Sequence, residues 1–255
     1  GGADHVIGHG NVTPDNVTSL VEGCIFTRAP KDKKYTAIFV GGSDMTAGEK
    51  LFKAVQKTFF ADFRVSVMLD SNGSNTTAAA GVAKLLTSGS IRDKRCVILA
   101  GTGPVGRRAA AMMALEGANV ALTSRTADRA RQTCADIKTT FDVDIEPIAA
   151  ADNEARARAV EDANVVFATG AAGTELLLPE HWQGNDNIEM IADANATPPL
   201  GIGGTEMFDR GENRNGKIIW GAIGFGTLKL AVHRACIGKL FESNDQLFDA
   251  GEIFA

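Results

Sequence analysis

The feature that most constrains the fold of this chain is a set of glycines between an apolar run and a helical pattern. Gly101, Gly103 and Gly106 follow "CVILA" with the spacing G-x-G-x-x-G. The first glycine permits a tight turn, the second lets a phosphate group approach the backbone, and the third lets a helix pack closely on a strand. The motif predicts a Rossmann-type dinucleotide-binding domain, with a sharp turn that binds nothing as the alternative. The expected cofactor contacts come from Gly101, Thr102, Gly103, Pro104, Val105 and Gly106.

The end of the next apolar run, "NVALT", carries a cation where an acid is usual. A unit that binds NAD commonly has Asp or Glu about twenty residues after the glycines, to bind the adenosine ribose. Here the chain reads Ser124-Arg125, and Arg129 follows one helical turn later. A planar guanidinium binds a phosphate with two parallel hydrogen bonds, and a serine hydroxyl adds a donor. We therefore expect NADP rather than NAD, with solvated arginines as the alternative.

Short apolar runs alternate with helical patterns along the chain, which is typical of an α/β fold with a largely parallel sheet. The early part predicts helices within 13–26, at 43–60 and at 74–88, and strands at 36–42 and 64–70. Ser43 or Asp44 would cap the second helix. In the later part, "CVILA", "NVALT", "NVVFAT" and "IEMIAD" are the expected strands.

The small and charged residues of 88–95 predict a boundary between two domains. We expect a smaller α/β domain in 1–90, the Rossmann domain in 91–226, and a C-terminal segment in 227–255. The amphipathic helix of that segment, at 227–243, is expected to return to the first domain.

Composition excludes several classes of function. The 255 residues carry a formal net charge of −5, which argues against a nucleic-acid partner, and no apolar run approaches the ~20 residues of a membrane span. The four cysteines are scattered, which predicts reduced thiols in a cytoplasmic protein. The four histidines form no zinc set, so no metal is expected. The chain begins without Met, which leaves a targeting segment open.

The usual acid–base groups of dehydrogenases are missing from the sequence. The single tyrosine, Tyr35, has Phe39 rather than Lys four residues later, so a Tyr-x-x-x-Lys pair is absent. Oxidation of an alcohol requires a base for the hydroxyl proton. Oxidation of a carbon between two nitrogens does not, because the departing hydride leaves a cation that both nitrogens stabilise. The sequence is compatible with this second chemistry.

Several longer motifs point to one family. They are "GNVTPDN" (10–16), "FVGGSDM" (39–45), "MLDSNGSNTTAAAGVA" (68–83), "LAGTGPVG" (99–106), "NATPPLGIGG" (195–204) and "LKLAVHRACIGKLFES" (228–243). Together they resemble the NADP-dependent methylene-tetrahydromethanopterin/methylene-tetrahydrofolate dehydrogenase of methylotrophic bacteria. The resemblance implies direct hydride transfer from a methylene-pterin to NADP, giving the methenyl form, in one-carbon metabolism. It also implies a pterin-binding first domain, an active site in the cleft between the domains, and a cytoplasmic homo-oligomer, with a trimer favoured. Full-length members begin earlier, so the N-terminal part of the first domain is expected to be missing.

The resemblance assigns Lys229 to the place nearest the chemistry, where it would position the substrate. Without the resemblance, a lysine in an amphipathic helix is usually solvated. His233 lies four residues later on the same helical face and is a candidate for substrate binding, with a packed or capping histidine as the alternative.

Two loops are candidates for contact with the pterin. One follows the strand at 64–70, and in open α/β folds ligands bind at that end of a strand; an Asx-turn with a helix cap is its alternative. The other is the segment "TPPLGIGG", which would offer backbone groups or serve only as a connector. The candidate residues are Asp70, Asn72, Ser74, Asn75 and Thr76 in the first loop, and Leu200, Gly201 and Ile202 in the second.

Two further positions are expected to border the nicotinamide half of the cofactor, because each follows a strand of the second domain. Thr169, Gly170 and Ala171 follow "NVVFA", and Asp193 and Asn195 follow "IEMIA". Purely structural roles are the alternative for these residues.

Two other functions stay open. A shikimate-dehydrogenase-like NADP oxidoreductase would require a lysine paired with an aspartate, and Lys53 or Lys84 with Asp70 is the available pair. A non-catalytic NADP-sensing module would need only the nucleotide site. The sequence does not decide which C1 carrier is preferred.

Overall fold

The computed structural model describes residues 2–255, which separate into two compact units. The first unit contains the chain up to Thr76 together with Leu230–Ala255, and the second contains Thr77–Lys229. The segment 88–95, expected to separate two domains, connects helix α3 (Ser74–Ser88) to strand β3 (Arg95–Leu99) inside the second unit. The reason lies in α3, where a Cβ on Gly81 would come within 2.5 Å of the ring of Phe167. The later part of α3 therefore packs on the sheet of the second unit.

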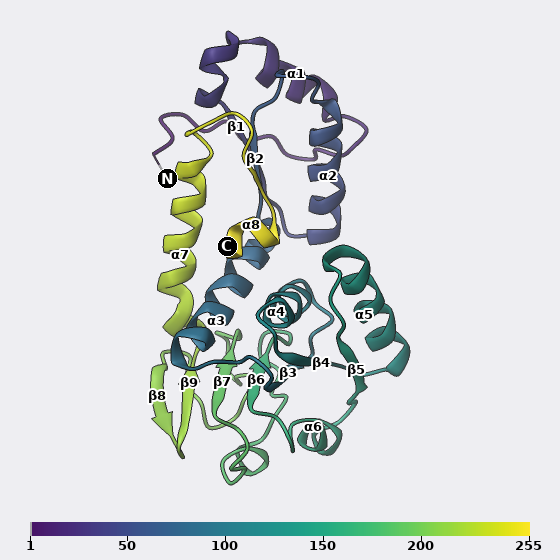
Figure 1. The fold of residues 1–255 in the computed structure, drawn as a ribbon, viewed down its shortest axis with the longest axis vertical. Helices are drawn as coiled ribbons and strands as arrows, with labels where there is room; N and C mark the ends of the chain where they lie inside the picture. The colour runs from purple at the N-terminus through teal and green to yellow at the C-terminus, as the bar shows by residue number, and fades with distance from the viewer. Residues whose placement is uncertain (1) are drawn as a thin grey trace. The chain divides into compact units, whose positions relative to one another are not determined.

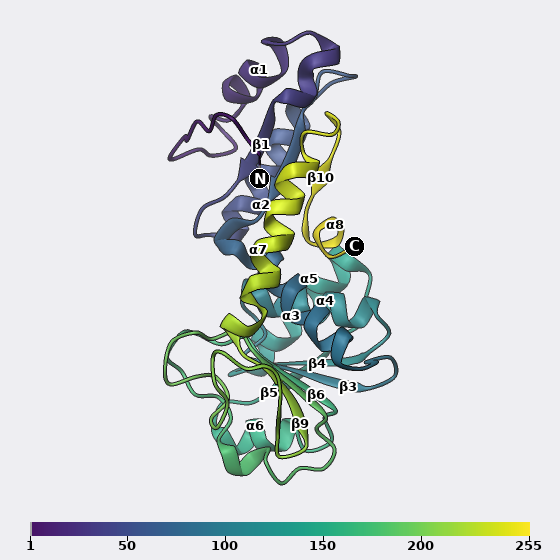
Figure 2. The same ribbon diagram turned by 90° about the vertical axis from the view of Figure 1, so that its left-hand side faces the viewer.

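The first unit is built on a three-stranded parallel sheet with the order β1-β2-β10; β1 and β2 are labelled in Figure 1, and β10 in Figure 2. Its elements are α1 (Thr18–Phe26), β1 (Ala37–Val40), α2 (Met45–Thr58), β2 (Ser66–Leu69), β10 (Leu247–Phe248) and α8 (Ala250–Phe254), with 3-10 turns at Pro30–Tyr35 and Ser71–Gly73. Its core joins Val21 and Ile25 of α1, Phe52 of α2 and Val67 of β2. Because β10 pairs with β2, the end of the chain completes the sheet that the beginning of the chain starts.

The helix predicted at 43–60 is observed as α2, and Asp44 is its N-cap. The Asp44 carboxylate accepts a hydrogen bond from the backbone N–H of Ala47 at 3.0 Å. This cap satisfies one of the free N–H groups in the first turn. Phe52 and Val55 are buried on the inner face of the helix, as their spacing predicted.

The second unit is a doubly wound sheet with the strand order β5-β4-β3-β6-β7-β9-β8. Its strands are β3, β4 (Asn119–Ser124), β5 (Glu146–Ala149), β6 (Val165–Ala168), β7 (Met190–Asp193), β8 (Arg210–Arg214) and β9 (Lys217–Trp220). All neighbours are parallel except β8 and β9. Read in chain order, β3 to β7 and β9 give the 3-2-1-4-5-6 arrangement of dinucleotide-binding folds.

The helices of this unit lie on both faces of the sheet. Figures 1 and 2 show α4 (Pro104–Leu115) and α5 (Ala127–Phe141) on one face and α6 (Asn153–Ala159) on the other. A 3-10 turn at Pro179–His181 lies in the connection between β6 and β7. The strand order reverses between β3 and β6, so the glycine motif after β3 lies at the point where such folds bind ligands.

The last long helix, α7 (Ala222–Lys239), begins before the predicted residue 227 and ends before 243. Glycines at its start interrupt the helical pattern, so the sequence predicted a later first residue. A Cβ on Gly224 would lie 1.7 Å from the backbone oxygen of Asp209, so only glycine lets the helix begin against that segment. Residues from Leu230 onward belong to the first unit.

Within residues 2–255 no helix is long and apolar enough to cross a membrane. In the same range, no group of three or more His, Cys, Asp or Glu side chains is arranged to hold a metal ion. All four cysteines are free thiols, of which Cys96, Cys134 and Cys236 are buried.

Candidate functional site

The glycine loop joins the carboxyl end of β3 to α4, and each glycine has a different surrounding. A Cβ on Gly106 would lie 2.5 Å from the Cα and 2.6 Å from the backbone oxygen of Gly101. A Cβ on Gly101 would lie 2.6 Å from Leu122 Cγ, whereas a Cβ on Gly103 would meet nothing within 4 Å. Two glycines thus permit close packing of helix and strand, and the middle one leaves open space in front of the backbone.

The beginning of α4 is free to bind an anion. Gly103 is its N-cap and offers no side chain, and Pro104 occupies the start of the helix. The first N–H groups of a helix have no partner within the helix, and the positive end of its dipole lies there. Together with the open space at Gly103, these groups form a cradle that suits a pyrophosphate.

The end of β4 is tied to the glycine loop by Thr123. The Thr123 hydroxyl accepts a hydrogen bond from Ala100 N–H at 2.9 Å, and its carbonyl accepts one from Gly101 N–H at 3.0 Å. Ser124 is buried, and its carbonyl accepts a hydrogen bond from Ala150 N–H at 2.7 Å. These bonds fix the next residue, Arg125, beside the glycine loop.

Arg125 and Arg129 are both exposed at the start of α5. Across residues 2–255, neither guanidinium forms a hydrogen bond or an ion pair. The N-cap of α5 is Thr126, whose hydroxyl accepts a hydrogen bond from the backbone of Arg129. Two cations with unused donors therefore flank a helix N-terminus, an arrangement that favours a phosphate.

The segment after β6 contacts the glycine loop. The Thr169 hydroxyl donates to the carbonyl of Leu99 at 3.2 Å, and its oxygen is the atom that a Cβ on Gly106 would approach at 2.5 Å. Gly170 is half-buried and Ala171 is exposed. Of the three residues predicted here, Thr169 is thus bonded to the strand that carries the glycine loop.

Asn195, predicted to contact the cofactor, shapes its own loop. Its side-chain oxygen accepts a hydrogen bond from Thr197 N–H at 2.8 Å, and its side-chain nitrogen donates to Pro199 O at 3.0 Å. The residue is buried, and the Pro198–Pro199 peptide bond within this loop is cis.

Asp193, predicted with Asn195 to border the nicotinamide half of the cofactor, is a buried carboxylate at the end of β7. The Asp193 side chain accepts hydrogen bonds from Asn195 N–H at 2.9 Å and from Ile202 N–H at 3.0 Å. Burial raises its pKa to about 6, against the opposing effect of bonds from the backbone of Asn195, Ile202 and Gly201. Its position after a strand was the basis of the prediction, and its hydrogen bonds to the following loop are what the structure adds.

The second predicted pterin segment has little free backbone at Gly201 and Ile202. The carbonyl of Gly201 accepts hydrogen bonds from Leu176 N–H at 2.8 Å and Leu177 N–H at 3.2 Å, and the N–H of Ile202 is bonded to Asp193. Leu200 is half-buried. These bonds favour the alternative reading, a connector, for Gly201 and Ile202.

In the first unit, Asp70 fixes the beginning of α3. Its carboxylate accepts hydrogen bonds from Asn75 N–H at 3.0 Å, Thr76 N–H at 3.2 Å and the Thr76 hydroxyl at 2.7 Å. The side-chain nitrogen of Asn75 donates to Leu69 O at 2.6 Å. Asp70, Asn75 and Thr76 therefore have structural partners, as the helix-cap reading described.

Two residues of this loop keep groups that a ligand could use. Asn72 is exposed and has a positive φ of 56°. The Ser74 hydroxyl is buried and has no hydrogen-bond partner within the described part of the chain. An unsatisfied buried hydroxyl costs free energy, so Ser74 is a good candidate for a bond to a bound molecule.

His233 completes this group of residues from α7. Its Nδ1 lies 3.4 Å from Asp70 Oδ2, and its ring meets the ring of Phe39 edge to face at 5.6 Å between centroids. The histidine is half-buried, and Phe39 is exposed. Lys229 lies one turn earlier in α7 and is half-buried, with no ion pair among the described residues. Of the lysines in the shikimate-type alternative, Lys53 is exposed, and Lys84 lies over the ring of Trp220 at 4.9 Å.

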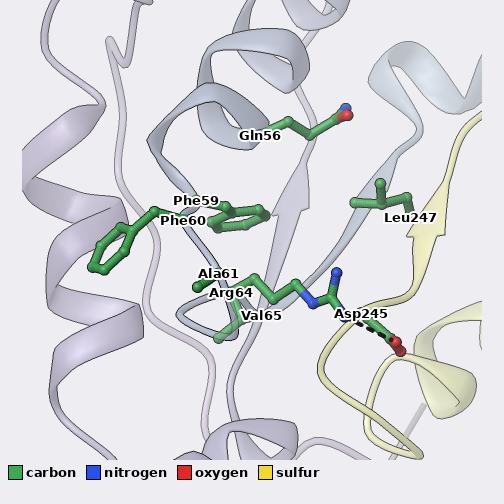
Figure 3. A pocket seen from close by; sticks show the side chains of 8 residues that line it. All are labelled: Gln56, Phe59, Phe60, Ala61, Arg64, Val65, Asp245 and Leu247. Atoms are coloured by element: carbon green, nitrogen blue, oxygen red, sulfur yellow. Dashed lines mark hydrogen bonds and ion pairs between the residues drawn. The ribbon is translucent and has the colours of Figure 1, made fainter.

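A cavity of about 280 Å³ lies at the other end of the first sheet, where β2 and β10 begin (Figure 3). Phe59, Phe60, Val65 and Leu247 give it apolar walls. Arg64 and Asp245 form an ion pair at 3.4 Å on its polar side. No residue predicted to bind cofactor or substrate lines it.

Comparison with known proteins adds three findings. The family described as "Methylene-tetrahydromethanopterin dehydrogenase, N-terminal" matches residues 1–72. The chain is 55% identical over 256 residues to the bifunctional protein MdtA of Methylorubrum extorquens, covering 100% of this chain and 89% of that protein. It is 31% identical over 255 residues to the NAD(P)-dependent methylenetetrahydromethanopterin dehydrogenase of the same organism, covering 96% and 86%. Among solved structures, a transhydrogenase from Sinorhizobium meliloti superposes with a TM-score of 0.47 at 16% identity, over 61% of this chain and 51% of that one.

Proposed function

Because the chain belongs to the methylene-tetrahydromethanopterin dehydrogenase family, we propose that it oxidises methylene-tetrahydromethanopterin to the methenyl form with NADP as hydride acceptor. The observation that carries the proposal is the glycine loop at the reversal of strand order, in a chain related along its length to a dehydrogenase of this name. Methylene-tetrahydrofolate is included as a second substrate, because it resembles the first at the reacting ring system.

The residues around the glycine loop fit a dinucleotide phosphate. The open space at Gly103 and the uncapped N-terminus of α4 would receive the pyrophosphate. Arg125, with Arg129 as a second cation, would bind the 2′-phosphate through its unused donors. A carboxylate in place of Arg125 would repel that phosphate, so the charge at this position favours NADP over NAD.

When bound, NADP supplies the hydride-accepting ring, and the chain's own residues position the two reactants. The carbon that loses the hydride lies between two nitrogens that share the resulting positive charge. No proton leaves in this step, so the chain needs no general base. This chemistry agrees with the absence of a Tyr-x-x-x-Lys pair from the sequence. What the protein must supply is orientation of the donor carbon towards the acceptor ring.

For the pterin we propose contacts from the loop after β2 and from α7. Ser74 has an unused buried hydroxyl, Asn72 is exposed in the same loop, and His233 lies against the Asp70 carboxylate that fixes the loop. We assign Lys229 a hydrogen bond to the substrate near its reacting nitrogens. Asp70, Asn75 and Thr76 then act by holding the loop rather than by touching the ligand.

The test is the formation of NADPH by the purified protein, followed by its absorbance. The substrates are methylene-tetrahydromethanopterin, methylene-tetrahydrofolate and shikimate, each with NADP and with NAD, alongside a reaction without substrate. We expect NADPH from the two methylene-pterins and none from shikimate. Turnover of shikimate alone would support the shikimate-type alternative, and binding of NADP without any turnover would support a sensing module.

We also propose a cytoplasmic homo-oligomer, with a trimer favoured. The four unpaired thiols support a reducing compartment, and the trimer rests on the resemblance to the family. Light scattering on the purified chain measures the oligomer directly, and a monomer at working concentration would contradict this part of the proposal.

A further inference from the structure

A carboxylate at the end of β7 is enclosed by the backbone of the loop that follows it. Asp193 is 1% exposed. One carboxylate oxygen accepts from Asn195 N–H and the other from Ile202 N–H, while the backbone of Gly201 adds a further bond. The two ends of the loop 194–202 are thereby joined to a single side chain.

The same side chain fixes how closely residue 201 approaches the sheet. A Cβ on Gly201 would lie 2.8 Å from Asp193 Oδ1 and 3.1 Å from the Cβ of Ala168, at the end of β6. On its other side, the Gly201 carbonyl accepts hydrogen bonds from Leu176 and Leu177. The loop after β7 is therefore held against the end of β6 and against the segment that follows β6.

That segment leads back to the glycine loop. Thr169 is the first residue after β6, and it bonds to Leu99 at the end of β3. Its hydroxyl oxygen also lies 2.5 Å from the position that a Cβ on Gly106 would take. A continuous series of contacts thus runs from Asp193 through Gly201 and the end of β6 to the phosphate-binding loop. The series lies along the carboxyl edge of the sheet, where such folds bind their ligands.

Holding this loop with a buried carboxylate costs free energy. No charged side chain contributes to its ionisation, which burial opposes and backbone N–H groups support. A buried carboxylate without an opposite charge beside it loses more hydration free energy than a neutral group of similar size. Its advantage is that an ionised carboxylate is an acceptor at both oxygens, whereas an amide or a protonated acid offers a donor at one of them.

We infer that Asp193 is a positioning residue for the nicotinamide half of the cofactor: its carboxylate holds the loop 194–202 in the place where that loop borders the nicotinamide ring. This inference rests on the proposed NADP site. Asp193 does not touch the ligand in this arrangement, and it acts through the backbone of Gly201 and Ile202. The adenosine half, bound near Arg125, lies on the β4 side of the glycine loop and is independent of Asp193.

The two halves of the cofactor give a direct test in the full chain. Binding of NADPH is compared with binding of 2′-phospho-ADP-ribose, which has the same phosphates but no nicotinamide, by calorimetric titration of wild type and Asp193→Asn. We expect the substitution to raise the Kd for NADPH about tenfold, as the loss of one well-placed interaction does, and to leave the Kd for 2′-phospho-ADP-ribose within about twofold. A role limited to overall stability would change both constants together.

Asp209→Asn is the matched control. Asp209 is also buried in the second unit and also accepts a backbone hydrogen bond, from Glu206 N–H at 2.8 Å, but it is paired with Arg214 near β8. This variant should bind both ligands like wild type at a temperature where it is folded.

A second measurement keeps the inference testable if Asp193→Asn does not fold. Because only the ionised carboxylate accepts at both oxygens, the wild-type Kd for NADPH should rise relative to that for 2′-phospho-ADP-ribose as the pH falls through about 6. The ratio cancels the titration of the shared 2′-phosphate. The groups bonded to the carboxylate are the backbone N–H groups of Asn195, Ile202 and Gly201, which do not titrate, and no charged side chain contributes to its ionisation.

An unchanged ratio of the two constants, both in Asp193→Asn and across this pH range, would overturn the inference while leaving the NADP site intact. Failure of the wild type to bind either ligand would instead overturn the proposed function, and the inference with it.

Discussion

The glycine loop allows cofactor binding and stability to be separated by two substitutions of the same kind, Gly103→Ala and Gly106→Ala. Each adds one methyl group to the same turn. At Gly103 the backbone is extended, with φ −77° and ψ 172°, and the added Cβ meets nothing within 4 Å. At Gly106 the added Cβ meets the Cα of Gly101 at 2.5 Å, its carbonyl oxygen at 2.6 Å and Thr169 Oγ1 at 2.5 Å.

The expected magnitudes differ accordingly. Two of the three contacts at Gly106 are with backbone atoms, so α4 must move away from β3, and overpacking of this kind costs about 1–3 kcal/mol. Alanine recovers up to ~1 kcal/mol through its better helix propensity. The net loss lies between about 0 and 3 kcal/mol, and its middle value of about 1.5 kcal/mol corresponds to a fall in Tm of roughly 3–6 °C for a chain of this size. Gly103→Ala should stay within about 0.5 kcal/mol of wild type.

Cofactor affinity should rank the two variants in the opposite order to stability, with the larger loss of affinity in Gly103→Ala. Its methyl group occupies the space that the pyrophosphate needs, and hydrogen bonds to a charged group are worth about 1.5–3 kcal/mol. The Kd for NADPH should therefore rise roughly 10- to 150-fold in Gly103→Ala, while its Tm is unchanged. Calorimetric titration and thermal unfolding monitored by circular dichroism measure the two quantities. Wild-type NADPH affinity in Gly103→Ala would refute the phosphate cradle, and an equal loss of Tm in both variants would refute the packing argument.

Three further predictions follow from charged groups. Arg125→Ala should raise the KM for NADP about 10-fold or more, the value of a charge-assisted phosphate contact, with little effect on the KM for NAD; equal effects on both would reject the phosphate assignment. Lys229→Gln should lower kcat with the methylene-pterin at least ~10-fold while the Kd for NADPH is unchanged, and unchanged turnover would remove Lys229 from the site. Finally, the pKa of Asp193 is raised from 3.8 to about 6 in the folded chain, so its contribution to stability is complete below pH ~4 and falls as the pH rises through about 6. Urea unfolding should show wild type losing about 3 kcal/mol over that range relative to Asp193→Asn, and parallel pH profiles of the two proteins would contradict the burial of this carboxylate.

The central strands of the second unit could be predicted because they are apolar on both faces. β3, β4, β6 and β7 are covered by helices or by neighbouring segments, so their sequences are nearly continuous apolar runs. β5 was not predicted, because it is an edge strand that contains Pro147 and keeps most of its residues partly or fully exposed. Whether a strand could be predicted from the sequence therefore depended on its position in the sheet rather than on its strand propensity.

The hairpin of β8 and β9 was also missed, although its turn carries a recognisable signal. Asn215 and Gly216 both have positive φ, of 52° and 79°, as a two-residue hairpin turn requires. An Asn-Gly pair between short strands is a strong hairpin pattern, but β8 is largely polar and masks it. Here the turn chemistry was a better guide than hydrophobic alternation.

The residues of the candidate site also differ in how far the sequence could predict them. The glycine loop and Arg125 could be predicted, because their spacing from two apolar strands determines their place. The sequence left open whether Asp70 and Asp193 face a ligand or hold their own loops, because both roles depend on what the following loop does. Asp70 turns its carboxylate back to cap α3, and Asp193 accepts from a residue nine positions later, Ile202. In both loops a sequence pattern identifies a polar residue after a strand, and only the structure shows whether its side chain faces a ligand or its own backbone.

The end of β4 shows why nucleotide choice can be independent of the fold. Thr123 joins the strand to the glycine loop, and Ser124 is buried and holds the backbone of Ala150. Arg125, the next residue, is exposed and has no partner across residues 2–255. A change from arginine to an acid at this position would reverse the charge presented to the adenosine ribose without removing a contact that the fold uses. In the proposed site, Arg125 is the residue that selects for the 2′-phosphate, and it lies just beyond the bonds that fix the strand. Substitutions there should change which nucleotide binds and leave the unfolding temperature as it is.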